Sequence, residues 1–225
     1  MKTILATVRE VKNASPTVKI ISLVPEEKIT FKPGQWIYVF ADKNGEKAKR
    51  AYSVASHPDE AELSLCVKRV ENGFMSNFLC GLSPGKKIEI SQPFGLFTLK
   101  DASKDTVFIA TGTGIAPFMS MIPELVKTGY SRSATVIFGA RTHDEILYAD
   151  EMKKFSQSLN VTFIPVLSRE AWKGEKGHVQ DAIRKYAKPG CEAYICGLMQ
   201  MVTEVRQLLE EMGFDKKRIH FENYI

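Results

Sequence analysis

The sequence predicts a two-part protein, in which a β-rich N-terminal part is followed by a part where strands and helices alternate. Two observations carry this prediction. Short runs of β-forming residues, separated by turn signals, fill the chain up to about residue 101. Beyond the polar stretch "DASKD" (101–105), apolar strands alternate with amphipathic segments of helical length. With 225 residues the chain is long enough for two compact domains.

The N-terminal elements are expected to be antiparallel strands. The stretch "ELSLCV" alternates apolar and polar residues at a period of two, and "KPGQ", "DKNG" and "SPGKK" provide the residues that tight turns require. The pattern indicates an antiparallel β-barrel or a β-sandwich. The predicted strands cover 4–8, 18–24, 36–40, 62–70 and 87–90, and "RAYSVAS" (50–56) adds a further β-rich segment.

The C-terminal elements are expected to form a parallel sheet covered on both faces by helices. Near-continuous apolar strands such as "ATVIF" are typical of strands that are buried on both sides. The predicted strands cover 106–111, 134–140, 161–167, 192–197 and 218–224, and the predicted helices cover 115–128, 149–158, 178–187 and 198–212.

Composition narrows the class of protein. The net charge is +5, but the basic residues are dispersed, so no nucleic-acid partner is expected. Four cysteines occur without a CxxC pair or metal-like spacing, and no metal site is predicted. The apolar run in "MKTILATVRE" is too short for a secretory h-region, and no run of about 18 apolar residues occurs, so neither a leader nor a membrane span is expected. A cytoplasmic location with free thiols is the default.

A glycine-containing loop, "TGTGIAPF" (111–118), connects the first strand of the parallel sheet to its first helix. In open α/β sheets ligands bind at the carboxyl ends of the strands, where a helix N-terminus favours a phosphate. Gly112 and Gly114 allow close approach of a pyrophosphate, and Thr111 and Thr113 offer hydroxyl groups. However, Pro117 replaces the third glycine of GxGxxG, and a strand-to-helix corner without a ligand is the alternative.

A second group of polar residues lies in the β-rich part. On an extended strand Arg50 and Tyr52 point to one side and Ser53 to the other. An arginine fork suits a phosphate, a tyrosine ring suits a planar heterocycle, and a hydroxyl group can donate to a ring nitrogen. Gly73 and Ser76, at the expected start of a helix, form a second possible anion cradle. Taken alone, the arginine segment is more typical of an ordinary edge strand.

These stretches together resemble the ferredoxin–NADP reductase superfamily of flavoproteins. The family's motifs occur in its order as "KPGQWIYV", "RAYSVAS", "LSLCVKRV", "SNFLCGLSPG", "TGTGIAPF", "LSRE", "YICGLMQM" and "FENY". The resemblance implies a six-stranded antiparallel flavin-binding β-barrel over 1–101. It also implies a doubly wound, five-stranded parallel NAD(P)-binding domain over 102–225, with the nicotinamide meeting the flavin in the cleft between the domains.

The resemblance also implies roles for individual residues. Around FAD, which is favoured over FMN by the second phosphate contact, the expected residues are Arg50, Tyr52, Ser53, Cys66, Val67, Lys68, Gly73 and Ser76. Around the pyrophosphate and nicotinamide of NAD(P) they are Thr111, Gly112, Thr113, Gly114, Cys196, Gly197, Glu222 and Tyr224. Ser53, Cys196, Glu222 and Tyr224 are the expected catalytic residues. One departure from the plant-type ending is that Ile225 follows Tyr224, which puts the stacking of that tyrosine on the flavin in question.

The choice between NADPH and NADH rests on another segment. Ser168 and Arg169 of "LSRE", with Lys176 and His178, stand where plant-type members bind the 2′-phosphate, so NADPH is favoured. The segment is two residues shorter than in that pattern, however, and "WKGEKGHV" also resembles a stretch of NADH-using relatives. A solvated loop without a ligand is the alternative for Lys176 and His178.

The function that the resemblance implies is transfer of a hydride between NAD(P)H and FAD. Single electrons would then pass to a separate carrier, for which an acidic ferredoxin or flavodoxin suits the positive net charge. Three alternatives stay open: a reductase component of an oxygenase, a free-flavin reductase, and a flavin-containing electron-transfer subunit of a larger complex. The oligomeric state is not predicted.

Overall fold

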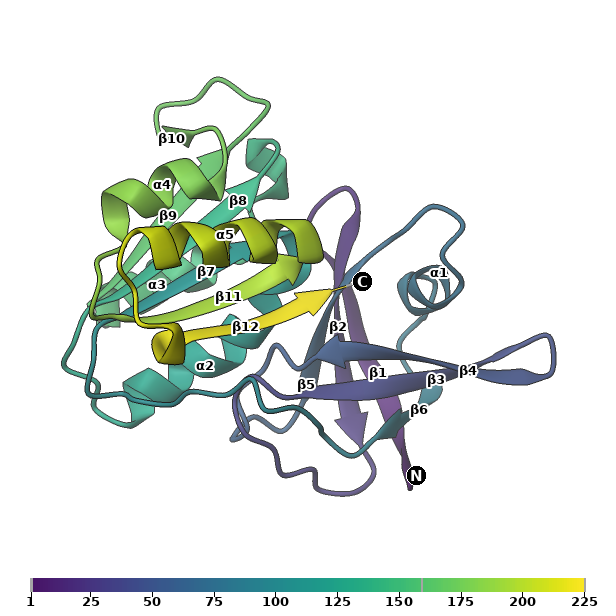
Figure 1. Ribbon diagram of the computed structural model, residues 1–225. Helices are drawn as coiled ribbons and strands as arrows, with labels where there is room; N and C mark the ends of the chain where they lie inside the picture. Colours follow the sequence, from purple (N-terminus) through teal and green to yellow (C-terminus); the bar gives the residue numbers. More distant parts are fainter. Residues whose placement is uncertain (1, 159, 225) are drawn as a thin grey trace. The chain divides into compact units, whose positions relative to one another are not determined.

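The computed structural model describes residues 2–158 and 160–224. Internal contacts divide the chain into two compact units, which are coloured along the sequence in Figure 1. One unit ends at Thr98 and also includes Ala116–Met121, and the other comprises Leu99–Ile115 and the residues from Ile122 onward. The chain therefore passes between the units close to the polar "DASKD" stretch, and the first half of one helix groups with the N-terminal unit.

The N-terminal unit is a six-stranded antiparallel sheet with the strand order β4-β3-β6-β1-β2-β5. Every predicted strand is present, and the β-rich segment around "RAYSVAS" supplies the end of β4. A short helix, α1 (Phe74–Cys80), lies between β5 and β6 in the chain. The strands are β1 (Thr3–Asn13), β2 (Val18–Pro25), β3 (Trp36–Lys43), β4 (Glu46–Ser53), β5 (Leu63–Lys68) and β6 (Lys87–Ser91).

This sheet curls so that its two outer strands meet. Val54, directly after β4, forms an antiparallel bridge with Leu65 of β5, and the N–H of Ala55 donates to the carbonyl of Ser64 at 2.7 Å. Alternate side chains such as Ile37 and Val39, both fully buried, fill the interior. The resulting closed antiparallel arrangement agrees with the predicted β-barrel.

The C-terminal unit contains a parallel sheet with the strand order β10-β9-β8-β7-β11-β12. The five predicted strands are joined by a sixth, β10 (Glu175–Lys176), which pairs with β9 at the edge of the sheet. The sequence shows no apolar run there, so it predicts no strand at these two residues. The others are β7 (Thr106–Thr111), β8 (Ala134–Ala140), β9 (Val161–Leu167), β11 (Glu192–Leu198) and β12 (Ile219–Tyr224).

Helices cover both faces of the parallel sheet, as the doubly wound prediction requires. Apolar residues of α4 and α5 share one buried cluster with Ile109 and Ile195 of the central strands. The connection order places α2 and α3 on the opposite face, as Figure 1 shows. The helices are α2 (Ala116–Lys127), α3 (Ala149–Ser158), α4 (Val179–Tyr186) and α5 (Met199–Glu211), with 3₁₀ turns η1 (Gly112–Ile115), η2 (His143–Glu145) and η3 (Lys216–Arg218).

None of the cysteines Cys66, Cys80, Cys191 and Cys196 forms a disulfide bond. Within residues 2–158 and 160–224, no group of three or more histidine, cysteine or acidic residues is arranged to hold a metal ion. In the same part of the chain, no helix has the length and apolar character needed to cross a bilayer.

Candidate functional sites

The end of β4 presents the first group of predicted site residues. In the ladder with β3, Tyr52 lies opposite Ile37 and Arg50 opposite Val39. Arg50 is exposed, Tyr52 is half-buried and Ser53 is buried. Burial raises the pKa of Tyr52 to about 12, although the nearby Arg50 charge acts in the opposite direction. Tyr52 is therefore a neutral, half-covered ring beside a guanidinium group, which fits a planar heterocycle that carries phosphate.

The predicted segment on β5 offers mainly its backbone. Cys66 and Val67 are buried and pair with Ile20 and Lys19 of β2, whereas the side chain of Lys68 is exposed. Because the Cys66 and Val67 side chains point into the protein, contacts of these two residues with a cofactor would be made by backbone groups.

The turn before α1 is held together by Ser76. Its hydroxyl group accepts from the N–H of Val70 at 3.1 Å and donates to the carbonyl of Gly73 at 3.2 Å. The side-chain amide of Asn77 donates to the carbonyl of Val70 at 2.9 Å and to that of Gly73 at 2.7 Å. A Cβ at Gly73 would lie 2.7 Å from the Ser76 hydroxyl oxygen, so only glycine fits at this position. Ser76 thus shapes the turn that opens α1, and Asn77 supports it without having been predicted.

A pocket of about 530 Å³ opens beside this turn. This volume lies within the range of small-molecule sites, which runs from about 300 to 1,000 Å³. The pocket therefore has room for the nucleoside part of a dinucleotide next to the turn at Gly73. Its lining residues are Pro16, Thr17, Arg69, Glu71, Asn72 and Asn77.

In the C-terminal unit, the glycine loop forms the 3₁₀ turn η1 at the carboxyl end of β7. Its two glycines are required for different reasons. Gly112 has a left-handed φ of +53°, and a Cβ there would meet no protein atom within 4 Å. A Cβ at Gly114 would lie 2.2 Å from the carbonyl oxygen of Cys196. Gly114 therefore serves packing, and Gly112 leaves open space at a strand end where a ligand can approach.

Three of the predicted catalytic residues come together on β11 and β12. Cys196 lies opposite Glu222 in the parallel ladder, and Leu198 lies opposite Tyr224. Burial raises the pKa of the Cys196 thiol well above its usual value, and the Glu222 carboxylate raises it further. A hydrogen bond with the Tyr224 side chain has the opposite effect. The group is thus a neutral thiol, a carboxylate and a phenol at one end of the sheet.

Gly197 connects this group to the glycine loop. A Cβ at Gly197 would lie 2.7 Å from the Thr111 hydroxyl oxygen, because β11 and β7 are adjacent strands. The glycine loop therefore occupies the same edge of the sheet as Cys196, Gly197, Glu222 and Tyr224. Ile225, which follows Tyr224, lies outside the described residues.

The residues predicted for the nucleotide's 2′-phosphate lie further along the same edge. Ser168 and Arg169 follow β9 directly, and both are exposed. Lys176 lies in β10, opposite Leu167. His178 is the N-cap residue of α4, and its N–H donates to the Asp181 carboxylate at 2.8 Å. Both side chains are exposed, one on a two-residue edge strand and the other at the start of a helix.

Sequence reasoning missed Arg141 at this corner. Arg141 is exposed at the carboxyl end of β8, and its carbonyl accepts the N–H of Arg169 at 2.9 Å. The two arginines therefore share one corner of the sheet. The strand-end rule that selected Ser168 and Arg169 would also have selected Arg141, because "GART" follows the predicted strand 134–140.

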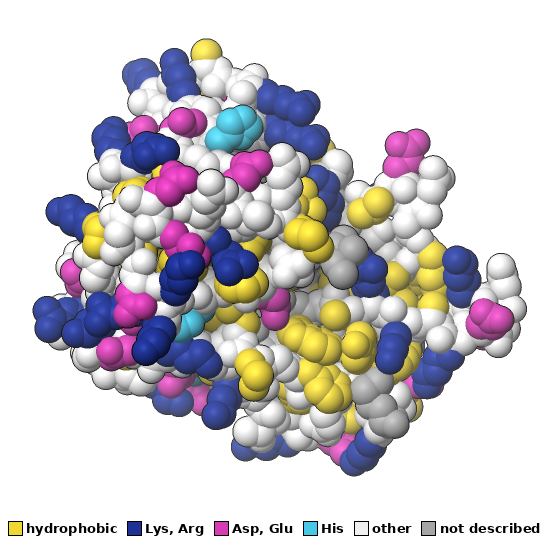
Figure 2. All heavy atoms as spheres, viewed as in Figure 1, with side chains coloured by type: hydrophobic (Ala, Val, Ile, Leu, Met, Phe, Trp, Pro, Cys, Tyr) yellow, Lys and Arg dark blue, Asp and Glu magenta, His cyan; other side chains and the backbone are white. Residues whose placement is uncertain are grey.

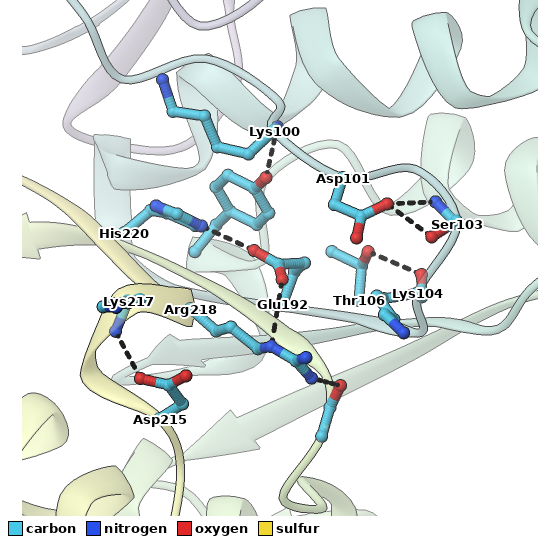
Figure 3. Close-up of polar contacts among 12 residues, drawn as sticks. Lys100, Asp101, Ser103, Lys104, Thr106, Glu192, Asp215, Lys217, Arg218 and His220 are labelled. Carbon is cyan, nitrogen blue, oxygen red and sulfur yellow. Dashed lines mark hydrogen bonds and ion pairs between the residues drawn. The ribbon is translucent and has the colours of Figure 1, made fainter.

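A separate polar network lies at the opposite, amino end of β11 and β12 (Figure 3). The buried carboxylate of Glu192 contacts His220 Nε2 at 2.7 Å, and Arg218 Nε lies 3.8 Å from its other oxygen. The His220 ring packs on Tyr194 with a centroid distance of 4.8 Å, and the Tyr194 hydroxyl accepts the Lys100 N–H at 2.8 Å. These contacts attach β12 to β11 two residues before Glu222.

Each unit thus presents one set of nucleotide-binding features: a half-buried ring with an arginine in the first, and a glycine turn with a thiol, a carboxylate and arginines in the second. This combination defines an oxidoreductase that binds a flavin and a nicotinamide nucleotide. Two family models match accordingly: the oxidoreductase FAD-binding domain over residues 5–99 and the oxidoreductase NAD-binding domain over residues 108–207.

Individual relatives narrow the class further. The chain is 34% identical over 230 residues to ferredoxin–NADP reductase B of Sorangium cellulosum, covering 95% of this chain and 94% of that protein. It is 32% identical to the phenol hydroxylase P5 protein of Acinetobacter pittii, covering 98% of this chain but 65% of that protein. The chain belongs to the ferredoxin–NADP reductase superfamily, as its motifs indicated, and it binds FAD and NAD(P).

A solved structure shows the same fold. The ferredoxin NADP⁺ reductase of Neisseria gonorrhoeae with bound FAD and NADP superimposes with a TM-score of 0.89 at 24% identity, covering 99% of both chains.

Proposed function

We propose that this protein is an FAD-dependent NAD(P)H reductase that passes single electrons to a separate acidic carrier, a ferredoxin or a flavodoxin. The observation that carries the proposal is the grouping of Cys196, Glu222 and Tyr224 beside the glycine loop, at the carboxyl edge of a nucleotide-binding sheet. A full-length relative that is named a ferredoxin–NADP reductase supports the choice of acceptor.

In the N-terminal unit, Arg50 would bind the flavin pyrophosphate and the Tyr52 ring would lie against the isoalloxazine. Ser53 would hydrogen-bond near N5, while the backbone of Cys66, Val67 and Lys68 and the turn at Gly73 and Ser76 would hold the remaining part of the cofactor. The half-buried position of the Tyr52 ring next to the exposed Arg50 supports this arrangement. The flavin supplies the chemistry, since it accepts a hydride and releases electrons singly.

In the C-terminal unit, Thr111, Gly112, Thr113 and Gly114 would bind the NAD(P) pyrophosphate, and Cys196 and Gly197 would border the nicotinamide. The protein's main contribution is positioning, because hydride transfer requires nicotinamide C4 within about 3–3.5 Å of flavin N5. Tyr224 would occupy the nicotinamide position in the absence of nucleotide and move aside when it binds. Glu222 would keep its carboxylate next to the buried thiol and exclude solvent anions from the site.

We favour NADPH as the preferred nucleotide. Ser168, Arg169 and Lys176 would bind the 2′-phosphate, as the sequence suggested, and Arg141 adds a second guanidinium group at the same corner. Two arginines that approach one phosphate each contribute a charge-assisted hydrogen bond of roughly 1.5–3 kcal/mol. His178, at the start of α4, remains a candidate contact. Cysteines that form no disulfide bond favour a reducing compartment, and we place the reaction in the cytoplasm.

A reductase component of an oxygenase is the second candidate. The observation that favours it is the similarity to the phenol hydroxylase P5 protein over nearly the whole chain. This candidate shares the flavin and nucleotide sites and differs only in the electron acceptor. The two functions are therefore separated by the acceptor and not by the cofactors.

The test is an anaerobic reduction followed by a comparison of acceptors. The purified protein should be yellow, and NADPH should bleach it faster than NADH. The reduced protein should then transfer electrons to ferredoxin or flavodoxin faster than to free flavin. A yellow protein that neither nucleotide bleaches would contradict the reductase function, and efficient transfer only to free flavin would contradict the carrier.

A further inference from the structure

The strand β12 lies at the edge of the parallel sheet and pairs only with β11 among the strands that the structure describes. An edge strand has backbone partners on one side only, so its position depends strongly on its side chains. Ile219, at the amino end of β12, is buried, whereas each described residue after it is half-buried or exposed. Glu222 and Tyr224, which we place at the nicotinamide, therefore lie on the part of β12 with the least burial.

His220 is the residue that anchors this part of the strand. Figure 3 shows the His220 ring and the Glu192 carboxylate pointing towards each other, with His220 Nε2 2.7 Å from the carboxylate oxygen. The same ring packs on Tyr194, whose side chain is fully buried in β11. Because side chains alternate between the two faces of a strand, His220, Glu222 and Tyr224 share one face of β12. The anchor and the site are therefore on the same face.

Glu192 holds the histidine firmly because it is itself buried. Its side chain is only 5% exposed, and Figure 2 shows charged side chains of both signs gathered on the surface around the amino end of β12. A buried carboxylate is costly unless it is paired and hydrogen-bonded. Its other neighbour, Arg218, is 3.8 Å away and also donates to the Gly190 carbonyl at 2.8 Å. The shorter contact of Glu192 is thus the one with His220.

These contacts also select the register of β12. Tyr194 lies opposite His220 in the observed ladder, and Cys196 lies opposite Glu222. A shift of β12 by one residue would turn Glu222 to the other face of the sheet. A shift by two residues would bring Glu222 opposite Tyr194 and next to Glu192, where two carboxylates would repel each other. The observed register instead places an imidazole beside the buried carboxylate.

We propose that His220 is a positioning residue for the hydride-transfer site. Through Glu192 and Tyr194 it fixes the register of β12, and it thereby places Glu222 and Tyr224 beside the nicotinamide. This inference rests on the proposed function, to which it adds a residue that controls the site from the opposite end of the strand. His220 acts through the backbone of β12 and not by contact with the nucleotide.

Loss of this anchor should affect nucleotide binding and hydride transfer in opposite directions. A displaced Tyr224 competes less for the nicotinamide position, so the oxidised nucleotide binds more tightly. A displaced Glu222 no longer borders the nicotinamide correctly, so fewer complexes reach the short distance between C4 and N5 that transfer requires. A residue that only stabilises the fold would not separate affinity from rate in this way.

The first measurement reports on β12 itself and needs no nucleotide. Hydrogen exchange followed by mass spectrometry compares His220→Leu, which removes the contact, with His220→Gln, whose amide can still donate to Glu192. Under conditions in which both variants are folded, we expect the β12 amides to exchange roughly 10-fold faster or more in His220→Leu and at about the wild-type rate in His220→Gln. Exchange in β8 should change little.

The second measurement uses the nucleotide. In His220→Leu the affinity for NADP⁺ should rise several-fold, whereas the rate of flavin reduction at saturating NADPH should fall roughly 10-fold. His220→Gln should restore both values. The matched control is Val161→Ala in β9, a buried position that three strands separate from β12. It lowers the stability of the same sheet and should leave both values unchanged.

A second variant covers the case in which His220→Leu fails to fold because Glu192 keeps a buried charge. Glu192→Gln/His220→Leu removes that charge, so it should fold and still show fast exchange in β12 together with the opposite changes in affinity and rate.

The other outcomes overturn the positioning role. Wild-type exchange in folded His220→Leu, or equal effects in Val161→Ala, would show that His220 does not hold β12. Fast exchange with unchanged affinity and rate would make the contact structural only, and a His220→Gln protein as impaired as His220→Leu would remove Glu192 from the argument. Failure of NADPH to reduce the flavin of the wild type would overturn the proposed function, whereas the exchange measurement would still report whether His220 fixes the strand.

Discussion

Cys196 and Glu222 lie opposite each other on the parallel strands β11 and β12, so a thiol that is fully buried has a carboxylate as its cross-strand neighbour. Both factors disfavour the thiolate. Near neutral pH, Cys196 is therefore a neutral, polarisable group and not a nucleophile. This agrees with a role in bordering the nicotinamide and argues against covalent chemistry at this position.

The raised pKa of Cys196 predicts a loss of stability at high pH. The thiol ionises more readily in the unfolded chain than in the folded protein, so its contribution is complete below about pH 8.5 and decreases as the pH rises towards the folded-state pKa. Between pH 9 and 10, the free energy of unfolding should fall more steeply in the wild type than in Cys196→Ser, by up to about 1.4 kcal/mol per pH unit. Urea unfolding at several pH values measures both slopes, and equal slopes would contradict the assignment.

Removal of the Tyr224 ring should change nucleotide binding without releasing the flavin. Tyr224→Ser is expected to bind nicotinamide nucleotides several-fold more tightly and to discriminate less between NADPH and NADH, because the ring no longer competes for the nicotinamide position. Tyr224→Phe is the matched control, since it retains the ring and loses only the hydroxyl group. Difference spectroscopy with both oxidised nucleotides gives the affinities, and wild-type values in Tyr224→Ser would remove Tyr224 from the site.

Arg50 is expected to determine flavin retention. Loss of one charge-assisted contact to the pyrophosphate should weaken flavin binding in Arg50→Ala by roughly 1.5–3 kcal/mol, which is about 10-fold to 150-fold. The ratio of flavin to protein absorbance after gel filtration reports the loss, and Lys12→Ala serves as a charge-matched control. An Arg50→Ala protein that keeps its full flavin content would show that the phosphate is bound elsewhere.

Arg141 and Arg169 are expected to decide nucleotide preference together. Each single alanine variant should lower kcat/KM for NADPH by about 10-fold or more and change kcat/KM for NADH little, because only NADPH has the 2′-phosphate. Arg132→Ala provides the control, since Arg132 is exposed just before the amino end of β8, at the opposite edge of the sheet. Parallel losses for both nucleotides would indicate that the arginines contact the shared part of the dinucleotide.

Much of this fold could be predicted from the sequence, because the spacing of the apolar residues along a strand depends on which of its faces are buried. The alternation in "ELSLCV" and the continuous apolar run in "ATVIF" distinguish a barrel strand from a central parallel strand without any tertiary information. The strand β10 could not be predicted, since Glu175 and Lys176 pair with β9 through backbone groups that leave no trace in side-chain pattern.

Side-chain roles that depend on tertiary contacts could not be predicted from the sequence either. The sequence offers Ser76 as a possible anion contact. In the structure its hydroxyl group is hydrogen-bonded to Val70 and Gly73, in the turn just before α1. His178 was selected for the phosphate and is found at the N-cap of α4. Arg141 belongs to none of the family motifs, although it follows the predicted strand 134–140 directly. In each case the residue type indicates a polar role, whereas the group that the side chain contacts depends on the folded structure.

The two glycines of the loop allow packing and ligand binding to be separated experimentally. Gly114→Ala places a Cβ 2.2 Å from the Cys196 carbonyl oxygen, so η1 and β11 must move apart, and we expect a destabilisation of about 1–3 kcal/mol. Gly112→Ala meets no protein atom and carries only the cost of a left-handed alanine, roughly 1 kcal/mol. If Gly112 faces the pyrophosphate, however, its variant should lose nucleotide affinity by at least 10-fold while retaining most of its stability. Thermal unfolding and nucleotide titration of both variants distinguish the cases, and a Gly112→Ala protein with wild-type affinity would return the loop to an ordinary strand-to-helix corner.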